Sequence, residues 1–208
     1  MMRRCVIVGA GEVRGEISIL ENDFVIAADG GYEYLEKMGV TPDVLIGDFD
    51  SIEALPRNLD ATQIIRHPVE KDETDMYLAY KVGVQNGCCE FYVYGGTGGR
   101  EDHTFANYCL LLDAINEGKR IFLMGVDRKI FVIKNEKIEL DSSAGKTLSV
   151  FAFGADAHGV TLRGVKYEAE NITLRQAFPL GVSNSVKNTD TRVEISVGDG
   201  ALLVMLER

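Results

Sequence analysis

"FYVYGGTGGREDHTFANYCLLLDAINEG", Phe91–Gly118, is the stretch that decides the fold class. Apolar and aromatic residues from Phe91 to Tyr94 predict a strand, the glycines that follow predict a loop, and a helical pattern then runs to Gly118. The helix is expected to bury one stripe, made of Phe105, Cys109, Leu112 and Ile115. A strand that enters a helix through a glycine loop indicates an α/β fold.

The same alternation runs through residues 1–125. A helix over 72–87 should bury Met76, Ala79, Tyr80 and Gly83 behind an N-cap at Asp72 or Thr74, and a shorter helix is expected over 32–38. Near-continuous apolar runs are typical of parallel strands covered on both faces. We therefore predict an N-terminal three-layer, Rossmann-like parallel-sheet domain with strands at Cys5–Gly9, Phe24–Ala28, Val44–Gly47, Gln63–Arg66, Phe91–Tyr94 and Arg120–Met124.

After Gly125 the helical patterns end. The remaining chain consists of strand-like pieces that Gly, Asn, Asp and Ser interrupt, which predicts a smaller C-terminal all-β domain over 126–208, a sandwich or a barrel. These pieces are 129–135, 137–140, 146–153, 159–167, 191–198 and 201–206.

Composition excludes several classes of protein. The chain has 208 residues and a formal charge of −10, and no basic cluster exceeds Arg3-Arg4, so a nucleic-acid partner is not expected. No apolar run approaches the ~18 residues of a membrane span. The 4 cysteines show no C-x-x-C spacing and have apolar neighbours, so we expect buried, reduced thiols and a cytoplasmic protein.

Two aspartates follow a strand in "VLIGDFDSI", Val44–Ile52. In an extended chain Asp48 and Asp50 point to the same side, and two such charges repel unless a cation lies between them. Asp29 ends another strand and Asp75 opens a helix. Because ligands of parallel sheets bind beyond the carboxyl ends of the strands, these acids have a reason to converge. The pattern predicts a hard cation such as Mg²⁺.

The loop from Gly95 to Gly99 predicts a phosphate site, since its backbone N–H groups, a helix N-terminus and Arg100 are all suited to an anion. "GAGEVRG", Gly9–Gly15, also follows a strand, but Arg14 stands where a dinucleotide fingerprint needs its third glycine. We interpret that segment as a tight turn. His103 fits a ligand contact or a helix cap equally well.

"AADGG", "PDVLIGDFDSI", "KDETD", "GGTGGREDHTFAN", "GVKY" and "GVSN" occur in this order between Ala27 and Asn184. Together they resemble the thiamine pyrophosphokinase family. The resemblance implies an α/β nucleotide domain and an all-β thiamine-binding domain, paired as a homodimer. It also implies Mg²⁺-dependent transfer of diphosphate from ATP to the hydroxyl of thiamine, which gives thiamine diphosphate and AMP.

Site residues follow from the same motifs. The resemblance implies that Asp29, Asp48, Asp50 and Asp75 hold Mg²⁺, and that Asp48, Asp50, Asp75 and Arg100 are catalytic. The implied ATP contacts are Asp29, Gly30, Lys71, Thr74, Gly96, Gly98, Gly99, Arg100, Asp102 and His103. Tyr167, Ser183 and Asn184 are the implied thiamine contacts. The chain has no tryptophan, and Tyr167 stands where animal members have one.

Two alternatives stay open at this point. A related diphosphokinase that acts on a pterin alcohol would share the nucleotide half, and a nucleotide-binding sensor would bind ATP without turnover. Asp75 and Asp102 are both candidates for accepting the proton of the hydroxyl group. The β-domain of one subunit is expected to complete the active site of its partner.

Overall fold

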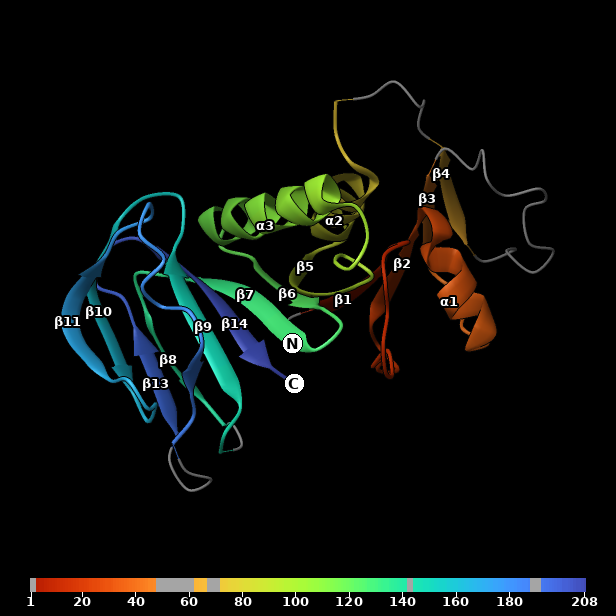
Figure 1. Cartoon of the computed structure of the whole chain (residues 1–208). Helices are drawn as coiled ribbons and strands as arrows, with labels where there is room; N and C mark the ends of the chain where they lie inside the picture. The colour runs from red at the N-terminus through yellow and green to blue at the C-terminus, as the bar shows by residue number, and fades with distance from the viewer. Residues whose placement is uncertain (1–2, 48–61, 67–71, 142–143, 188–191) are drawn as a thin grey trace. The chain divides into compact units, whose positions relative to one another are not determined.

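The computed structural model describes residues 3–47, 62–66, 72–141, 144–187 and 192–208. The chain divides into two compact units, Met1–Leu110 with Glu117–Val126, and Leu111–Asn116 with Asp127–Arg208. Figure 1 traces their elements, which make the fold mixed α/β. We retain 1–125 and 126–208 as proposed domain boundaries. Among the described residues, no helix is both long and apolar enough to span a membrane.

The first unit contains a parallel sheet with the strand order β6-β5-β1-β2-β3-β4. The predicted strand positions are confirmed, although β5 begins three residues before the expected Phe91 and β1 runs over Arg3–Val8 where Cys5–Gly9 was expected. The strands are β1 (Arg3–Val8), β2 (Phe24–Ala28), β3 (Val44–Gly47), β4 (Gln63–Arg66), β5 (Cys88–Tyr94) and β6 (Arg120–Met124).

Helices cover both faces of this sheet. On α1 (Tyr32–Lys37), which follows the short 3-10 helix η1 (Asp29–Gly31), Leu35 packs in one core with Val6 of β1. On α2 (Asp75–Gln85), Gly83 lies directly against the side chains of Cys5 and Phe91. Neighbouring residues of a strand point to opposite faces, so Val6 and Cys5 place the two helices on different sides. Three layers result.

The predicted inner side of α2 is confirmed, whereas that of α3 is wrong. Met76, Ala79, Tyr80 and Gly83 are the buried residues of α2, and Thr74 caps it by accepting a hydrogen bond from the backbone N–H of Tyr77 at 3.2 Å. On α3 (Glu101–Asn116), Phe105 is 63% exposed and Cys109 is also exposed. The residues that α3 buries are Asn107, Leu110, Leu111 and Ala114. Both stripes have helical spacing, and the buried one can contain the polar residue Asn107 because its amide has a hydrogen-bond partner there.

Cysteine burial follows the prediction only in part. Cys5 and Cys88 are buried, Cys89 is partly exposed, and Cys109 is exposed; all four thiols are free. Burial raises the pKa of the Cys5 thiol, so this group stays protonated at neutral pH.

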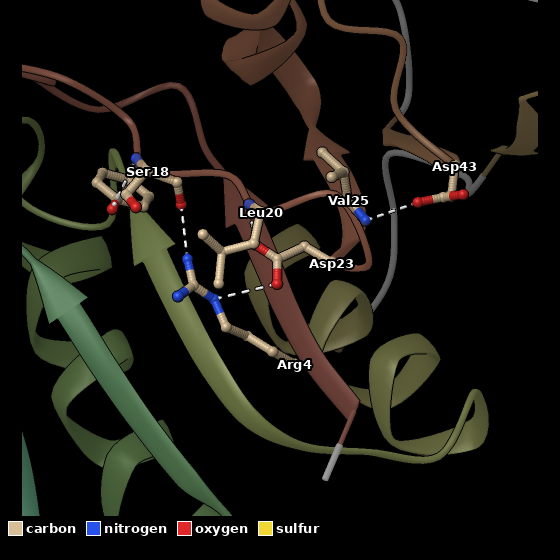
Figure 2. A network of polar contacts seen from close by, with 7 residues as sticks. Arg4, Ser18, Leu20, Asp23, Val25 and Asp43 are labelled. Carbon is tan, nitrogen blue, oxygen red and sulfur yellow. Dashed lines mark hydrogen bonds and ion pairs between the residues drawn. The ribbon is translucent and has the colours of Figure 1, made fainter. Parts of the chain in front are cut away.

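A polar network links strands β1 and β2 to the segments beside them (Figure 2). The guanidinium of Arg4 donates to the carbonyl of Ser18 at 2.7 Å and forms an ion pair with Asp23 at 3.2 Å. Val25 of β2 donates its N–H to a carboxylate oxygen of Asp43 at 2.8 Å. Arg4 also lies over the ring of Tyr92, 4.1 Å from its centroid. These contacts fix strand positions, which in turn position the loops at the opposite ends of the strands.

The second unit is built from two antiparallel sheets. Their strand orders within the unit are β12-β9-β14-β7 and β11-β10-β13-β8. The predicted all-strand character is confirmed, but β11 and β12 were not expected from the sequence. The strands are β7 (Arg128–Lys134), β8 (Lys137–Leu140), β9 (Thr147–Ala152), β10 (Ala157–Arg163), β11 (Ala169–Leu174), β12 (Asn184–Ser185), β13 (Val193–Ser196) and β14 (Ala201–Glu207).

Candidate active site

A cavity of about 320 Å³ opens at the carboxyl ends of the parallel strands. This is the edge at which open α/β sheets bind ligands. Residues that follow β1, β2 and β5 form its walls, together with the first residues of α2 and one side of α3. The lining residues are Gly9, Ala10, Gly11, Ala28, Asp29, Thr74, Asp75, Met76, Gly95, Gly96, Thr97, Gly99, Arg100, His103, Thr104 and Asn107.

Two glycine loops lie side by side in this wall. The backbone N–H of Gly11 donates to the carbonyl of Gly95 at 2.9 Å, and that of Glu12 donates to the carbonyl of Thr97 at 3.1 Å. A Cβ atom on Gly11 would lie only 2.5 Å from the Gly95 oxygen, so glycine is required for this approach. Gly95 itself has a φ of 66°, which L-residues rarely adopt. The loop after β1 is therefore part of the site, and our interpretation of it as an ordinary turn was incomplete.

The pairing also decides which polar groups of the second loop remain available. Carbonyls of Gly95 and Thr97 point toward the first loop, and a trans peptide directs its N–H away from its C=O. The N–H groups in the same planes, those of Gly96 and Gly98, therefore point away from the first loop. Among the described residues, neither these two N–H groups nor those of Thr97 and Gly99 donate to a protein acceptor. Successive N–H groups without protein acceptors are suited to an anion. The structure thus supports the predicted phosphate loop.

Two of the four predicted metal ligands meet in the cavity. Asp29 has a left-handed φ of 48°, and its carboxylate lies over Gly47, the last residue of β3. Asp75 begins α2 directly after the cap Thr74 and lines the same cavity. Within the described ranges, no three His, Cys, Asp or Glu side chains are spaced to hold a metal ion.

Three predicted site residues cannot be placed. Asp48, Asp50 and Lys71 lie outside the described residues. Asp48 nevertheless follows Gly47 directly in the sequence, and Gly47 is the residue over which the Asp29 carboxylate lies.

Arg100 and Asp102 form a bidentate pair at the start of α3. Nε of Arg100 donates to Oδ1 of Asp102 at 3.1 Å, and Nη2 donates to Oδ2 at 2.6 Å. The hydrogen bonds that Arg100 donates to Asp102 lower the pKa of the Asp102 carboxyl group and raise the pKa of the guanidinium. Arg100 and His103 line the cavity, whereas Asp102 does not. Asp102 therefore contacts Arg100 and not the cavity.

The predicted thiamine residues lie together in the second unit. The Asn184 amide accepts hydrogen bonds from the N–H groups of Tyr167 at 3.0 Å and Ser185 at 2.9 Å, and it donates to the carbonyl of Tyr167 at 2.8 Å. Asn184 is only 7% exposed, whereas the Tyr167 side chain is 63% exposed. Asn184 thus holds the backbone of Tyr167, and Tyr167 presents its ring. Ser183 has a φ of 56° and donates its N–H to Ser149 at 3.1 Å.

Several lining residues were missed by sequence reasoning. Gly9, Ala10 and Gly11 were assigned to a turn, and Thr104 and Asn107 received no role. One signal in the sequence was a polar residue at the helical position of Asn107, close to the glycine loop. Gly30 and Gly98, which were predicted to contact ATP, do not line the cavity. Gly30 follows Asp29, and Gly98 stands between Thr97 and Gly99, and these three residues do line it.

The fold and the cavity define a class. An α/β unit with a glycine loop suited to an anion at its strand ends, followed by an all-β unit, is typical of a two-unit α/β protein that handles a phosphorylated ligand. A model of the catalytic domain of thiamin pyrophosphokinase matches residues 18–123, and a model of its vitamin B1 binding domain matches residues 133–202. The chain therefore belongs to the thiamin pyrophosphokinase family, as its motifs indicated, and is a diphosphotransferase.

Individual relatives agree with this assignment. The thiamine pyrophosphokinase of Bacillus subtilis (strain 168) is 29% identical over 189 residues, which cover 89% of this chain and 87% of the relative. A crystal structure of that enzyme from Bacillus subtilis has a TM-score of 0.88 at 25% identity and 99% coverage of both chains. Thiamin pyrophosphokinase from Candida albicans shares the fold with a TM-score of 0.73 at 18% identity, over 99% of this chain and 89% of that one.

Proposed function

We propose that this protein transfers the terminal diphosphate of ATP to the hydroxyl group of thiamine, with Mg²⁺ as cofactor. The thiamine oxygen bonds to the β-phosphorus while the bond from that phosphorus to the AMP oxygen breaks, and the hydroxyl proton passes to a base. The observation that carries the proposal is one cavity in which a glycine loop, Arg100, Asp29 and Asp75 meet. The family supplies the reaction class.

The polyphosphate chain fits the groups of the first unit. N–H groups of the glycine loop with Gly96, Gly98 and Gly99 receive phosphate oxygens. Asp102 holds Nε of Arg100 and one N–H of its Nη2, which leaves the N–H groups of Nη1 and the second N–H of Nη2 as a fork of donors for phosphate. Thr74 and His103 line the same space, with Gly30 and Lys71 as further proposed contacts. Diphosphoryl transfer depends mainly on positioning and charge neutralisation, which this set of groups provides.

The carboxylates fit a hard cation. Asp29 and Asp75 line one cavity, and we propose that Asp48 and Asp50, which lie outside the described residues, join them as the all-oxygen ligands that Mg²⁺ takes. Bound Mg²⁺ would neutralise phosphate charge and orient the polyphosphate. Because Asp102 is engaged with Arg100, we do not propose it as the acceptor of the hydroxyl proton.

Thiamine is proposed to stack on Tyr167, whose backbone Asn184 holds, with Ser183 beside it. We further propose a homodimer in which this surface completes the cavity of the partner. Exposed large hydrophobic side chains support an interface in the second unit, since such groups mark association surfaces. They are Tyr167 at 63%, Phe178 at 52%, Leu180 at 58% and Val182 at 58% exposure.

The experiment is an incubation of the protein with Mg-ATP and thiamine, in which AMP and thiamine diphosphate are quantified. Equimolar formation of both is the expected result. A pterin alcohol replaces thiamine in a parallel reaction. Product formation only with the pterin would favour the related diphosphokinase, and ATP binding without AMP release would favour the sensor.

The metal assignment is tested with Asp48→Asn and Asp50→Asn. Each should remove nearly all turnover, and without Mg²⁺ neither should lower thermal stability, because removing one of two repelling charges relieves strain in the empty site. Asp141→Asn is the control, since that carboxylate is 90% exposed in the second unit. Wild-type rates of either variant at limiting Mg²⁺ would refute the assignment.

A complementation experiment tests the shared site. Asp75→Asn and Tyr167→Ala subunits are each expected to be weak, and a heterodimer would contain one site with both native residues. Activity should therefore rise after the two variants are mixed and exchange subunits. Proven exchange without a gain would mean that one chain supplies the whole site.

A further inference from the structure

Asn107 is a buried amide for which the proposed reaction has no direct use. It lies on α3, is 6% exposed and lines the cavity with part of its surface. Its Nδ2 donates to the carbonyl oxygen of Gly96 at 2.7 Å. Burying an amide costs free energy unless its hydrogen bonds are made, so an apolar residue would be expected on the inner side of this helix. The amide has a specific target, and that target is the glycine loop.

The contact fixes one peptide plane of the loop. When the Gly96 carbonyl points to Asn107, the N–H of Thr97 in the same planar unit points the opposite way. The neighbouring carbonyls of Gly95 and Thr97 are already held by Gly11 and Glu12. Donors on two different elements therefore hold three successive carbonyls, and Asn107 is the only side chain among these donors.

Packing around Gly96 leaves little room for a side chain at this position. A Cβ atom there would lie 3.1 Å from Cγ1 of Val93 and 3.3 Å from Cδ2 of Leu123. The position of Gly96 is thus set by the strand side chains beneath it, whereas rotation of its carbonyl is opposed by the hydrogen bond from Asn107. Glycine rotates more freely than other residues, so loss of this donor would allow the carbonyl oxygen to turn toward the cavity. An oxygen turned in that direction repels phosphate.

We infer that Asn107 is a positioning residue for the polyphosphate of the nucleotide, acting through the Gly96 carbonyl and not by contact with the reacting atoms. The inference rests on the proposed function, since it assumes a phosphate chain at this loop. It assigns the residue to nucleotide binding and separates it from thiamine binding.

The test uses Asn107→Leu and Asn107→Asp in the full-length protein, with a non-hydrolysable ATP analogue and Mg²⁺ in a direct binding titration. We expect Asn107→Leu to weaken analogue binding about tenfold or more, the effect of one lost hydrogen bond together with an inverted dipole. The thiamine KM should stay within about twofold of wild type. Asn86→Ala is the matched control, because its amide also donates to a backbone carbonyl, that of Val82, at the far end of α2.

Asn107→Asp gives a second readout, the pH dependence of analogue binding, which would not change if Asn107 had a purely structural role. A protonated carboxyl group can donate to the Gly96 carbonyl, whereas a carboxylate can only repel it. Analogue binding by Asn107→Asp should therefore recover toward wild type as the pH is lowered. Asp29, Asp75, Arg100 and His103, the charged or titratable groups that line the same cavity, are present in both proteins, so their contribution is removed by comparison with wild type at each pH.

Each outcome decides the inference. Equal analogue binding by Asn107→Leu and wild type, equal loss of ATP and thiamine affinity, or no recovery of Asn107→Asp at low pH would overturn it. If both variants fail to fold, the amide serves stability and the inference is wrong. Failure of the wild-type protein to bind the analogue would instead refute the proposed function.

Discussion

Replacing Gly11 with alanine should separate the two glycine loops. The new Cβ atom would lie 2.5 Å from the carbonyl oxygen of Gly95 and 2.8 Å from that of Thr97, whereas ordinary contacts begin at 3.4 Å. Both obstacles are backbone atoms, so neither can rotate away. The loops must therefore part by about 1 Å, close to the difference between these distances. This movement stretches the hydrogen bonds from Gly11 to Gly95 at 2.9 Å and from Glu12 to Thr97 at 3.1 Å beyond useful length.

The magnitude follows from those two bonds. At about 0.5–1.5 kcal/mol each, their loss lowers the free energy of unfolding by about 1–3 kcal/mol. A chain of this size loses about 2–4 °C in Tm per kcal/mol, so a fall of roughly 2–12 °C is expected. Because the displaced carbonyls belong to the proposed phosphate loop, the KM for ATP should rise more than the KM for thiamine.

Calorimetry and steady-state kinetics provide the assay, with Gly99→Ala as the control for stability. The nearest atom to a Cβ on Gly99 is the Cα of Gly11 at 3.9 Å, so this change should leave Tm unaltered. Gly11→Ala with a wild-type Tm and an unchanged KM for ATP would show that the loops do not need this close approach. Equal destabilisation by both variants would show that any side chain in these loops is harmful, whatever it touches.

Three further changes test other parts of the structure. Arg100→Lys should reduce turnover nearly as much as Arg100→Ala, about 10²-fold, because an ammonium group cannot replace a bidentate fork. A lysine variant with full activity in a rate assay would show that Arg100 does not take part in the reaction. Asn184→Ala should lower the free energy of unfolding by about 2–4 kcal/mol in urea titrations and raise the thiamine KM. The reason is that three hydrogen bonds are lost, two of them to the backbone of Tyr167. An unchanged KM would show that Tyr167 does not bind thiamine. Tyr80 donates to Glu117 at 2.8 Å, and this hydrogen bond lowers the pKa of the Glu117 carboxyl group. The stabilisation from this hydrogen bond is present above the ordinary pKa of glutamate, about 4.3, and is lost as the pH falls through the lowered pKa of Glu117. The difference in the free energy of unfolding between wild type and Tyr80→Phe should therefore narrow on acidification. A constant difference in thermal melts down to pH 3 would contradict this.

The sequence alone predicted those features for which a local pattern is compatible with one structure only. The apolar strands of the first unit, the cap at Thr74 and the buried side of α2 all follow from periodicity and capping preferences, which depend on near neighbours in the chain. The order of the motifs also identified the family. These features need no knowledge of what lies across the sheet.

Features that depend on distant residues were decided only by the tertiary structure. Two stripes of α3 have helical spacing, and which of them is buried depends on what the fold packs against the helix. Asn107 is accommodated in the buried stripe because the Gly96 carbonyl accepts its hydrogen bond. Gly9–Gly11 has the local form of a turn, and its place in the cavity arises because β1 and β5 are neighbours in the sheet. Asp102 and Asn184 are typical ligand residues by type, yet they hold Arg100 and the backbone of Tyr167. The sequence by itself determined which residue types were available. The tertiary structure decided what each of them contacts, because a hydrogen bond forms only between groups that the fold brings together.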